Sequence, residues 1–169
     1  MRFLTSWLSP TDSSLILYFG VDVKSLFERG KDFPWPRPAS CPTPGCGSRR
    51  LWGHGYVRRY FEEYFQPFWV KRYRCPECEA VHTLRPRTFY KRFWYSALTI
   101  LVSLLNKIIY GRWLRCLSRQ VQQYWFKGFL FQCSRRSTTR SPPLEALRRL
   151  LLLKLIPVTH STECEILAL

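Results

Sequence analysis

The chain has 169 residues, enough for one domain of ordinary size or two very small ones. It carries 27 lysines and arginines against 11 aspartates and glutamates, a formal net charge of +16 at pH 7. In a compact chain this many positive charges repel one another, which indicates a polyanionic partner: DNA, RNA or an anionic membrane surface. Apolar residues make up 46% of the chain and aromatic residues 17%, which excludes a disordered basic tail. We therefore expect a folded protein whose small core needs additional support.

The N-terminal sequence MRFLTSWLSP is too short and too interrupted by serine and proline to be a signal peptide. We therefore expect a cytoplasmic protein. In that reducing compartment, closely spaced cysteines bind metals more often than they form disulfides.

The first half of the chain is predicted to contain a lead-in and a small sheet. Residues 1–35 form the lead-in, in which VDVKSLFERG predicts a short helix that ends at Gly30. Residues 36–90 contain two cysteine pairs and three segments rich in aromatic and β-branched residues. These segments predict the strands of a small antiparallel sheet: LWGHGYVRRYF, YFQPFWVKRYRC and AVHTL.

The second half is predicted to be helical. Within residues 94–133, WYSALTILVSLLNKIIYG predicts a helix that ends before Gly111, and two more helices are expected in RWLRCLS and RQVQQYWFKGFLFQ. Residues 134–143 have the composition of a linker, and residues 144–169 form a short helix and a tail. No apolar stretch reaches the roughly 20 residues that span a membrane.

The two cysteine pairs have the spacing of one metal site. Cys41 and Cys46 form a C-x4-C turn, and after 28 intervening residues Cys75 and Cys78 form a C-x2-C turn. Two such turns at the end of a hairpin supply four thiolates in a tetrahedron, which suits zinc, although iron accepts the same ligands. His82 is either a substitute ligand or an ordinary strand residue. Four protein ligands leave no open position on the ion, so we predict a structural zinc ribbon.

Basic residues cluster on and directly after the predicted ribbon, interleaved with aromatic residues. From residue 64 through residue 94 only Glu77 and Glu79 are acidic. Cations at a surface neutralise phosphates, and aromatic side chains either pack the core or stack on bases. The residues predicted to bind nucleic acid in this part are Arg49, Arg50, Arg58, Arg59, Lys71, Arg72, Arg74, Arg85 and Arg87.

The helical segment offers a second candidate surface. A helix ending near Gly111, a short helix through Leu117 and a helix from about residue 119 have the order of a helix-turn-helix, although an ordinary three-helix core fits the same pattern. Arginine suits guanine and glutamine suits adenine in the major groove. The residues predicted to contact base edges are Arg119, Gln120, Gln122 and Gln123. The predicted fold class is thus α+β, a small antiparallel zinc ribbon followed by a helical, helix-turn-helix-like segment.

This order of parts is similar to that of a known family. The sequences CPTPGCGSRRLWGHGYVRRYF and WVKRYRCPECEAVHTLRPRTF, followed by helices, resemble the zinc-ribbon and helix-turn-helix N-terminal region of bacterial insertion-sequence transposases over roughly residues 35–130. The resemblance implies a bacterial protein that binds DNA at element ends, with zinc held by the four cysteines. The first cysteine pair departs from the family, because its spacing is wider than the common C-x2-C.

The acidic residues needed to cut DNA are missing from this pattern. Transposases of this kind use an Asp/Asp/Glu triad on a separate domain, and two-metal chemistry needs convergent carboxylates. Here the aspartates precede the ribbon, and the acids after Glu79 lie near the end: Asp12, Asp22 and Asp32, then Glu145, Glu163 and Glu165. We therefore expect a zinc-stabilised DNA-binding protein that is not an enzyme and that binds duplex DNA, alone or with a transposase or other protein. The alternative is a structural module that binds RNA or a protein.

Overall fold

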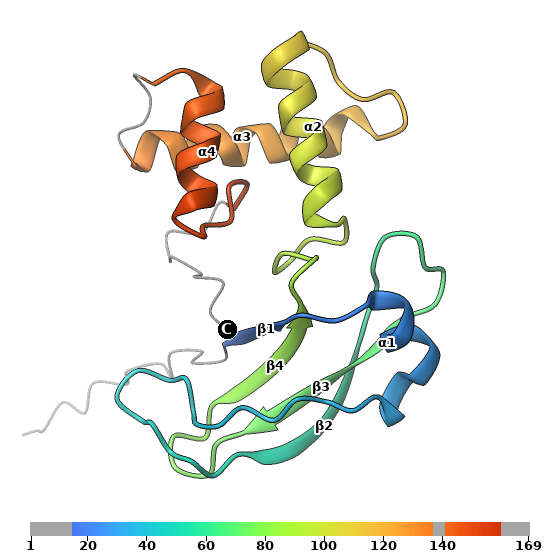
Figure 1. Ribbon diagram of the computed structural model, residues 1–169, viewed down its shortest axis with the longest axis vertical. Helices are drawn as coiled ribbons and strands as arrows, with labels where there is room; N and C mark the ends of the chain where they lie inside the picture. The colour runs from blue at the N-terminus through green and yellow to red at the C-terminus, as the bar shows by residue number, and fades with distance from the viewer. Residues whose placement is uncertain (1–14, 137–140, 160–169) are drawn as a thin grey trace, which may run out of the picture. The chain divides into compact units, whose positions relative to one another are not determined.

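The protein is a mixed α+β chain in a computed structural model that describes residues 15–136 and 141–159. Its described part contains one four-stranded sheet and four α-helices (Figure 1). The chain divides into two compact units. The first runs to Tyr60 and resumes at residues 65–86, and the second comprises residues 61–64 and the chain from Arg87. Each unit is described by itself below.

The first unit is built on the sheet. Strands β2 (Trp52–Arg59), β3 (Phe68–Arg74) and β4 (Val81–Pro86) are antiparallel neighbours and lie where the sequence predicts them. The strand β1 (Ile16–Phe19) adds a fourth position, so the order is β1-β4-β3-β2, with β1 parallel to β4. From sequence this apolar stretch is predicted only to be part of a lead-in, because nothing local indicates a partner so distant in the chain.

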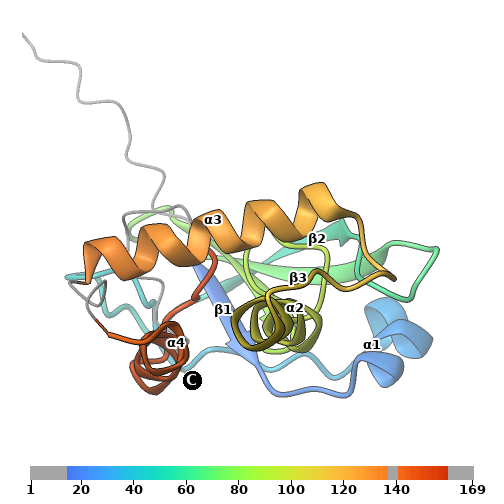
Figure 2. The same ribbon diagram turned by 90° about the horizontal axis from the view of Figure 1, so that it is seen from above.

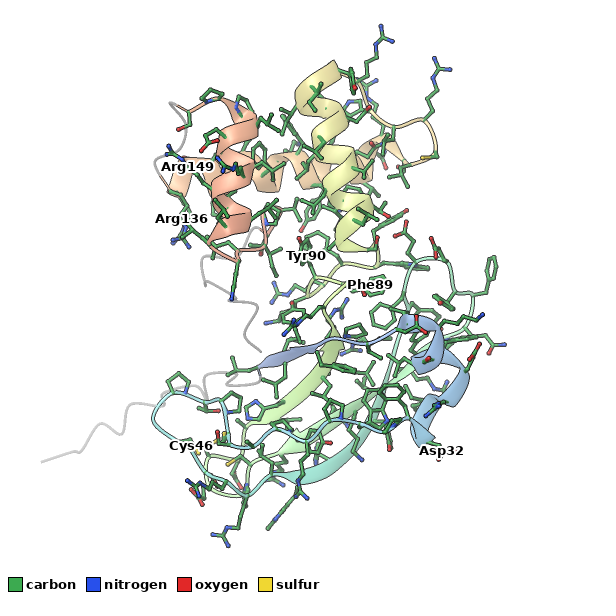
Figure 3. The ribbon with its side chains drawn as sticks, viewed as in Figure 1. Asp32, Cys46, Phe89, Tyr90, Arg136 and Arg149 are labelled. Carbon is green, nitrogen blue, oxygen red and sulfur yellow. The ribbon has the colours of Figure 1, made fainter. Side chains whose placement is uncertain are left out.

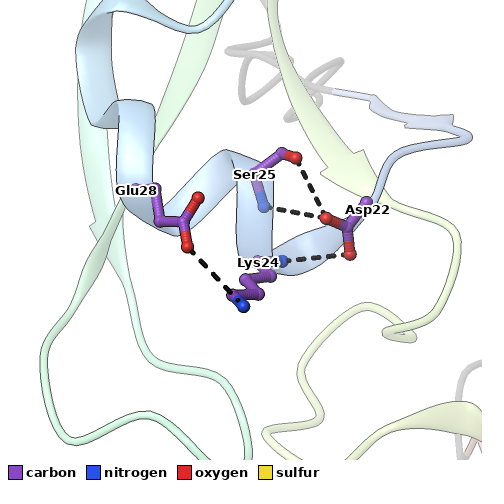
Figure 4. Close-up of polar contacts among 4 residues, drawn as sticks. All are labelled: Asp22, Lys24, Ser25 and Glu28. Carbon is purple, nitrogen blue, oxygen red and sulfur yellow. Dashed lines mark hydrogen bonds and ion pairs between the residues drawn. The ribbon is translucent and has the colours of Figure 1, made fainter.

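The predicted short helix is α1 (Val23–Arg29), which is followed by the 3-10 turn η1 (Gly30–Asp32). The carboxylate of Asp22 begins the helix by accepting hydrogen bonds from the backbone N–H groups of Lys24 and Ser25, at 3.3 and 3.0 Å (Figure 4). These bonds lower the pKa of Asp22, the one to the Ser25 backbone most strongly. Gly30 ends the helix at a φ of +54°, a conformation that glycine adopts without strain.

Aromatic side chains hold the segment after η1 across the sheet. The ring of Phe33 lies 6.3 Å from that of Phe19 in β1, and the ring of Trp35 lies 6.1 Å from that of Tyr56 in β2. The hydroxyl of Tyr73 in β3 donates to the carbonyl of Pro36 at 3.1 Å. These contacts reach three strands, so they direct the chain toward the first cysteine pair.

The second unit contains α2 (Ala97–Tyr110), α3 (Arg119–Arg135) and α4 (Pro143–Leu152). Figures 1 and 2 show α2 and α4 side by side, with α3 crossing both. A continuous core joins the three helices through large buried side chains, among them Ile100, Leu104, Trp125, Phe129 and Leu150. This packing, and not helix propensity alone, stabilises helices of this length.

The predicted short helix through Leu117 does not form, because residues 111–118 make an irregular loop between α2 and α3. Gln122 of α3 supplies hydrogen bonds that this loop lacks. Its amide oxygen accepts from Leu114 N at 2.9 Å and from Ser103 Oγ at 2.9 Å. Its amide nitrogen donates to the carbonyls of Leu114 and Leu117, at 2.9 and 3.1 Å. Gln122 is completely buried, so the prediction that it contacts base edges is wrong.

Parts of several predictions lie outside the described residues. These are residues 1–14 of the lead-in with Asp12, residues 137–140 of the linker, and residues 160–169 of the tail with Glu163, Cys164 and Glu165. Within residues 15–136 and 141–159, no helix combines the length and the apolar character needed to cross a membrane.

Replacing Gln122 with leucine should destabilise the second unit by about 2–4 kcal/mol, because buried backbone groups of the loop then lose their partners. The matched control is Gln120→Leu on the exposed face of α3, which should change the free energy of unfolding by no more than about 0.5 kcal/mol. Denaturant unfolding followed by circular dichroism measures both. Equal stabilities of the two variants would contradict the structural role of Gln122.

Candidate metal centre

The four cysteines of the predicted site lie in two tight loops of the first unit. Cys41 and Cys46 are in the loop before β2, where Cys41 N donates to Ser48 O at 2.7 Å and Cys46 N donates to Thr43 O at 3.0 Å. Cys75 and Cys78 are in the turn between β3 and β4, which Cys75 N closes by donating to Ala80 O at 3.0 Å. Figure 3 shows Cys46 at the end of the sheet opposite Asp32.

Glycine makes the first loop possible. Gly45 and Gly47 flank Cys46 with φ angles of +79° and +60°, in the left-handed region that residues with a Cβ rarely adopt. The loop can therefore turn sharply on both sides of one cysteine and direct its sulfur toward the other three.

The sulfur atoms converge as the sequence spacing predicts. All four Sγ atoms lie within 4.8 Å of one another, with Cys41 and Cys78 3.5 Å apart and Cys46 and Cys75 3.6 Å apart. A disulfide needs about 2.05 Å, so these thiols are free. Four sulfurs at the usual 2.3 Å from one tetrahedral ion would be about 3.8 Å apart. The spacing therefore fits a metal site with four sulfur ligands.

The surroundings lower the pKa of two of these thiols, which favours metal-binding thiolates, and raise the pKa of the other two. The backbone N–H of Ala80 lowers the pKa of Cys78 to about 6, and the backbone N–H of Cys78 lowers the pKa of Cys75. Burial raises the pKa of Cys41. For Cys46 the backbone N–H of Ser48 acts to lower the pKa, but burial and the neighbouring thiols raise it to about 12. Four thiolates thus need a bound cation to coexist here.

His82 is a strand residue of β4 that also contacts the site. Its ring is completely buried, and its Nε2 lies 3.3 Å from Cys41 Sγ. Its Nδ1 has no hydrogen-bond partner in the structure, and burial lowers the pKa of the ring, which favours the neutral form. With the proton on Nε2, the ring donates to the sulfur and leaves only an acceptor unpaired. We therefore assign His82 to the support of Cys41 and not to the ligand set.

The predicted nucleic-acid-binding residues are distributed over both units. Arg49, Arg50, Arg58 and Arg59 of the first unit are exposed, and Lys71, Arg72 and Arg74 of β3 are half-buried. In the second unit Arg87, Arg119 and Gln120 are exposed and Gln123 is half-buried. Arg85 is buried in β4 and, like Gln122, is not placed to contact a phosphate or a base, which corrects its prediction.

Cations and aromatic rings meet on one face of β2 and β3. The strand register sets Tyr56 opposite Lys71 and Arg58 opposite Trp69. Lys71 Nζ lies 4.3 Å from the centre of the Tyr56 ring, and Arg58 lies 5.0 Å from that of Trp69. Lys31 of η1 lies 4.3 Å from Trp69 and joins this face, although nothing in its local sequence indicates that it does. These rings hold cations in place.

Acidic residues neutralise only part of the positive charge near the cysteines. Arg50 pairs with Glu77 at 3.6 Å, and Arg74 pairs with Glu79 at 2.9 Å. Within the described residues, Arg49, Arg58 and Arg59 have no carboxylate partner. Uncompensated positive charge therefore remains on the loop after Cys46 and on β2.

Comparisons with protein-family models, with curated proteins and with solved structures found no match to this chain. The function is therefore inferred from the chemistry of the site itself and not from a relative.

Replacing Cys75 with serine should abolish stoichiometric metal binding, because one of four ligands is lost from the buried side of the site. Cys116→Ser, which changes an exposed cysteine of the second unit, is the control and should retain one metal ion per chain. Metal analysis of the purified, reduced proteins measures both. A metal-free wild type, or equal metal content in the two variants, would contradict the assignment.

Proposed function

We propose that this chain is a zinc-stabilised DNA-binding protein whose metal is structural. Four sulfur donors within 4.8 Å of one another suit zinc better than the oxygen-preferring divalent ions, and four protein ligands leave the zinc no position for a reacting water. The metal then contributes folding free energy, of order 10 kcal/mol in small zinc modules, and its role is to hold the surface around it.

The observation that carries the proposal is the uncompensated positive charge on β2 and the loop before it. Arg49, Arg58 and Arg59 lie in the segment that starts at the metal site and continues along the sheet. Arginines of this kind bind phosphates and release condensed counterions from DNA. The rings of Tyr56 and Trp69 already contact Lys71 and Arg58, so they support the cations more than they stack on bases. Such a surface favours binding that tolerates many sequences.

The second unit adds to the same proposal. No acidic residue occurs from residue 80 through residue 144, so α2 and α3 carry only positive and neutral side chains. Arg119 and Gln120 lie in the exposed first turn of α3, where the helix dipole also favours a phosphate. These residues are candidates for contact with the DNA backbone or with base edges.

We infer that the protein does not cut DNA, because most acids of the described part already accept hydrogen bonds or pair with basic side chains. Asp22 caps α1, while Glu77 and Glu79 pair with arginines. Glu62 accepts hydrogen bonds from Ser96 N at 2.8 Å and from the Thr99 hydroxyl at the start of α2. A relation to the N-terminal region of insertion-sequence transposases would make element ends the target, and that relation remains a hypothesis based on the cysteine and arginine pattern.

One observation favours an alternative partner. Trp52 at the start of β2 is more than half exposed, and an exposed indole can stack on an unpaired base. A module for RNA or another single strand would bind such a strand more tightly than duplex DNA. A comparison of duplex DNA, single-stranded DNA and RNA at equal salt decides between the two.

The affinity for duplex DNA should fall linearly with salt on a double-logarithmic plot. Changing both Arg58 and Arg59 to glutamine should reduce the magnitude of that slope by up to about 1.8, since each phosphate contact contributes about 0.9. Lys24→Gln is the control, because Lys24 on α1 is paired with Glu28 at 4.0 Å (Figure 4). Fluorescence anisotropy with labelled duplex measures all three proteins.

A slope near zero for the wild type would overturn the electrostatic basis of the proposal. A loss of slope in Lys24→Gln equal to half of that in the double variant, and so equal per charge removed, would show that net charge alone is responsible, and not the surface of β2.

A further inference from the structure

Two helices of the second unit expose parallel stripes of apolar side chains. On α2 the stripe contains Leu98, Leu101, Val102 and Leu105, at the i, i+3, i+4 and i+7 spacing of one helix face. On α4 the exposed members are Leu144, Leu151 and Leu152, and the buried Leu147 lines the same side of the helix. Leu98 is 71% exposed and Leu152 is 70% exposed. Leu98 and Leu152 are not part of the core, which α2 and α4 enter through Ile100, Leu104, Leu147 and Leu150.

An open groove of about 430 Å³ lies between the two helices, and the described residues that line it are Leu101 and Leu105 of α2 and Leu144, Leu147, Arg148, Leu151 and Leu152 of α4. The helices lie side by side, and α3 crosses the pair without contributing to the lining (Figure 2). A volume of this size accommodates two or three large apolar side chains. Exposed apolar surface that is both continuous and concave marks an interaction site more often than a solvated face.

The charge around the groove restricts its occupant. The one charged side chain in the lining is Arg148. α2 has no acidic residue, and Glu145, the single acid of α4, is already paired with Arg148 at 3.6 Å and with Arg149 at 3.4 Å. The groove is therefore apolar with a positive rim. A second copy of this chain is disfavoured, because it would bring another net charge of +16 to the interface.

We propose that the groove between α2 and α4 binds an acidic amphipathic helix of a partner protein. Large apolar side chains at i, i+3 or i+4, and i+7 of that helix would enter between the leucine stripes. Its flanking carboxylates would face Arg148 and the basic chain around it. A lipid surface fits this groove less well, because binding to a membrane does not require a concave site on the protein. This inference concerns the second unit alone and is independent of the metal and of DNA.

The test uses a synthetic peptide of about 18 residues, or five helical turns, with leucines on one face and glutamates beside them. A scrambled peptide of equal composition has the same charge without the apolar face. Fluorescence anisotropy with the full-length protein should show micromolar binding of the first peptide and much weaker binding of the second. The preference should persist when the salt concentration is raised, because apolar contact is not screened.

Matched leucines identify the groove. Leu144→Ser and Leu152→Ser should each weaken peptide binding about tenfold. Leu130→Ser is the control, because Leu130 on α3 is 49% exposed, the same fraction as Leu144, and lies outside the lining. Arg148→Glu should weaken binding of the acidic peptide and should strengthen binding of a version of the peptide whose glutamates are replaced by lysines. That reversal of preference cannot result from simple unfolding, and thermal unfolding of each variant is measured alongside.

Five results would overturn the proposal. Equal binding of both peptides would show that charge attraction alone accounts for the binding. An effect of Leu130→Ser as large as that of Leu144→Ser would show that the groove is not the binding site. Binding to phosphatidylcholine–phosphatidylglycerol vesicles that requires Leu152, without peptide binding, would assign the face to a membrane. Self-association that Leu144→Ser abolishes would assign it to a second copy. Peptide binding that appears only in the double variant Ile166→Ser/Leu167→Ser would show that the C-terminal segment of this chain is the natural occupant of the groove. The DNA affinity of the Leu144 and Leu152 variants should be unchanged, which separates this test from that of the proposed function.

Discussion

The convergence of four thiol groups within 4.8 Å is the constraint on which the first unit depends. Burial opposes charge on Cys41, while backbone N–H groups favour it on Cys75 and Cys78, so the loops alone stabilise only part of the negative charge. A bound divalent cation would supply the rest. Because Cys41 and Cys78 are 37 residues apart, one ion held by these cysteines would close a long loop and join the approach to β2 with the β3–β4 turn.

The metal and the positive surface are therefore parts of one arrangement. In the proposed protein the ion would fix the loop that precedes β2, and β2 carries Arg58 and Arg59 along the sheet. Aromatic contacts from residues 33–38 hold the same strands from one face, which keeps the cations in register. The second unit is stabilised differently, by a continuous apolar core and by the hydrogen bonds of Gln122. Loss of the metal should consequently affect the two units unequally.

The features that sequence predicts best are those set by local chemistry. The cysteine pairs are recognisable because glycine and proline surround them, and the end of α2 is recognisable because Gly111 adopts a φ of +69° there. The pairing of β1 cannot be predicted from local sequence, because its parallel partner β4 lies more than 60 residues away in the chain. Gln122 is misassigned for a different reason: its polarity suggests a surface position, but an irregular loop needs its amide in the interior. The groove between α2 and α4 depends on helix packing, which no local pattern reports.

Hydrogen–deuterium exchange of the protein with and without its metal tests the central claim most directly. The account predicts that a chelator removes amide protection from residues 52–86 of the sheet, while residues 97–135 of the helical unit keep theirs. Restoring zinc should restore the protection. Unchanged protection of the sheet after complete metal removal would show that the four cysteines do not hold this fold, and the account of the first unit would be wrong.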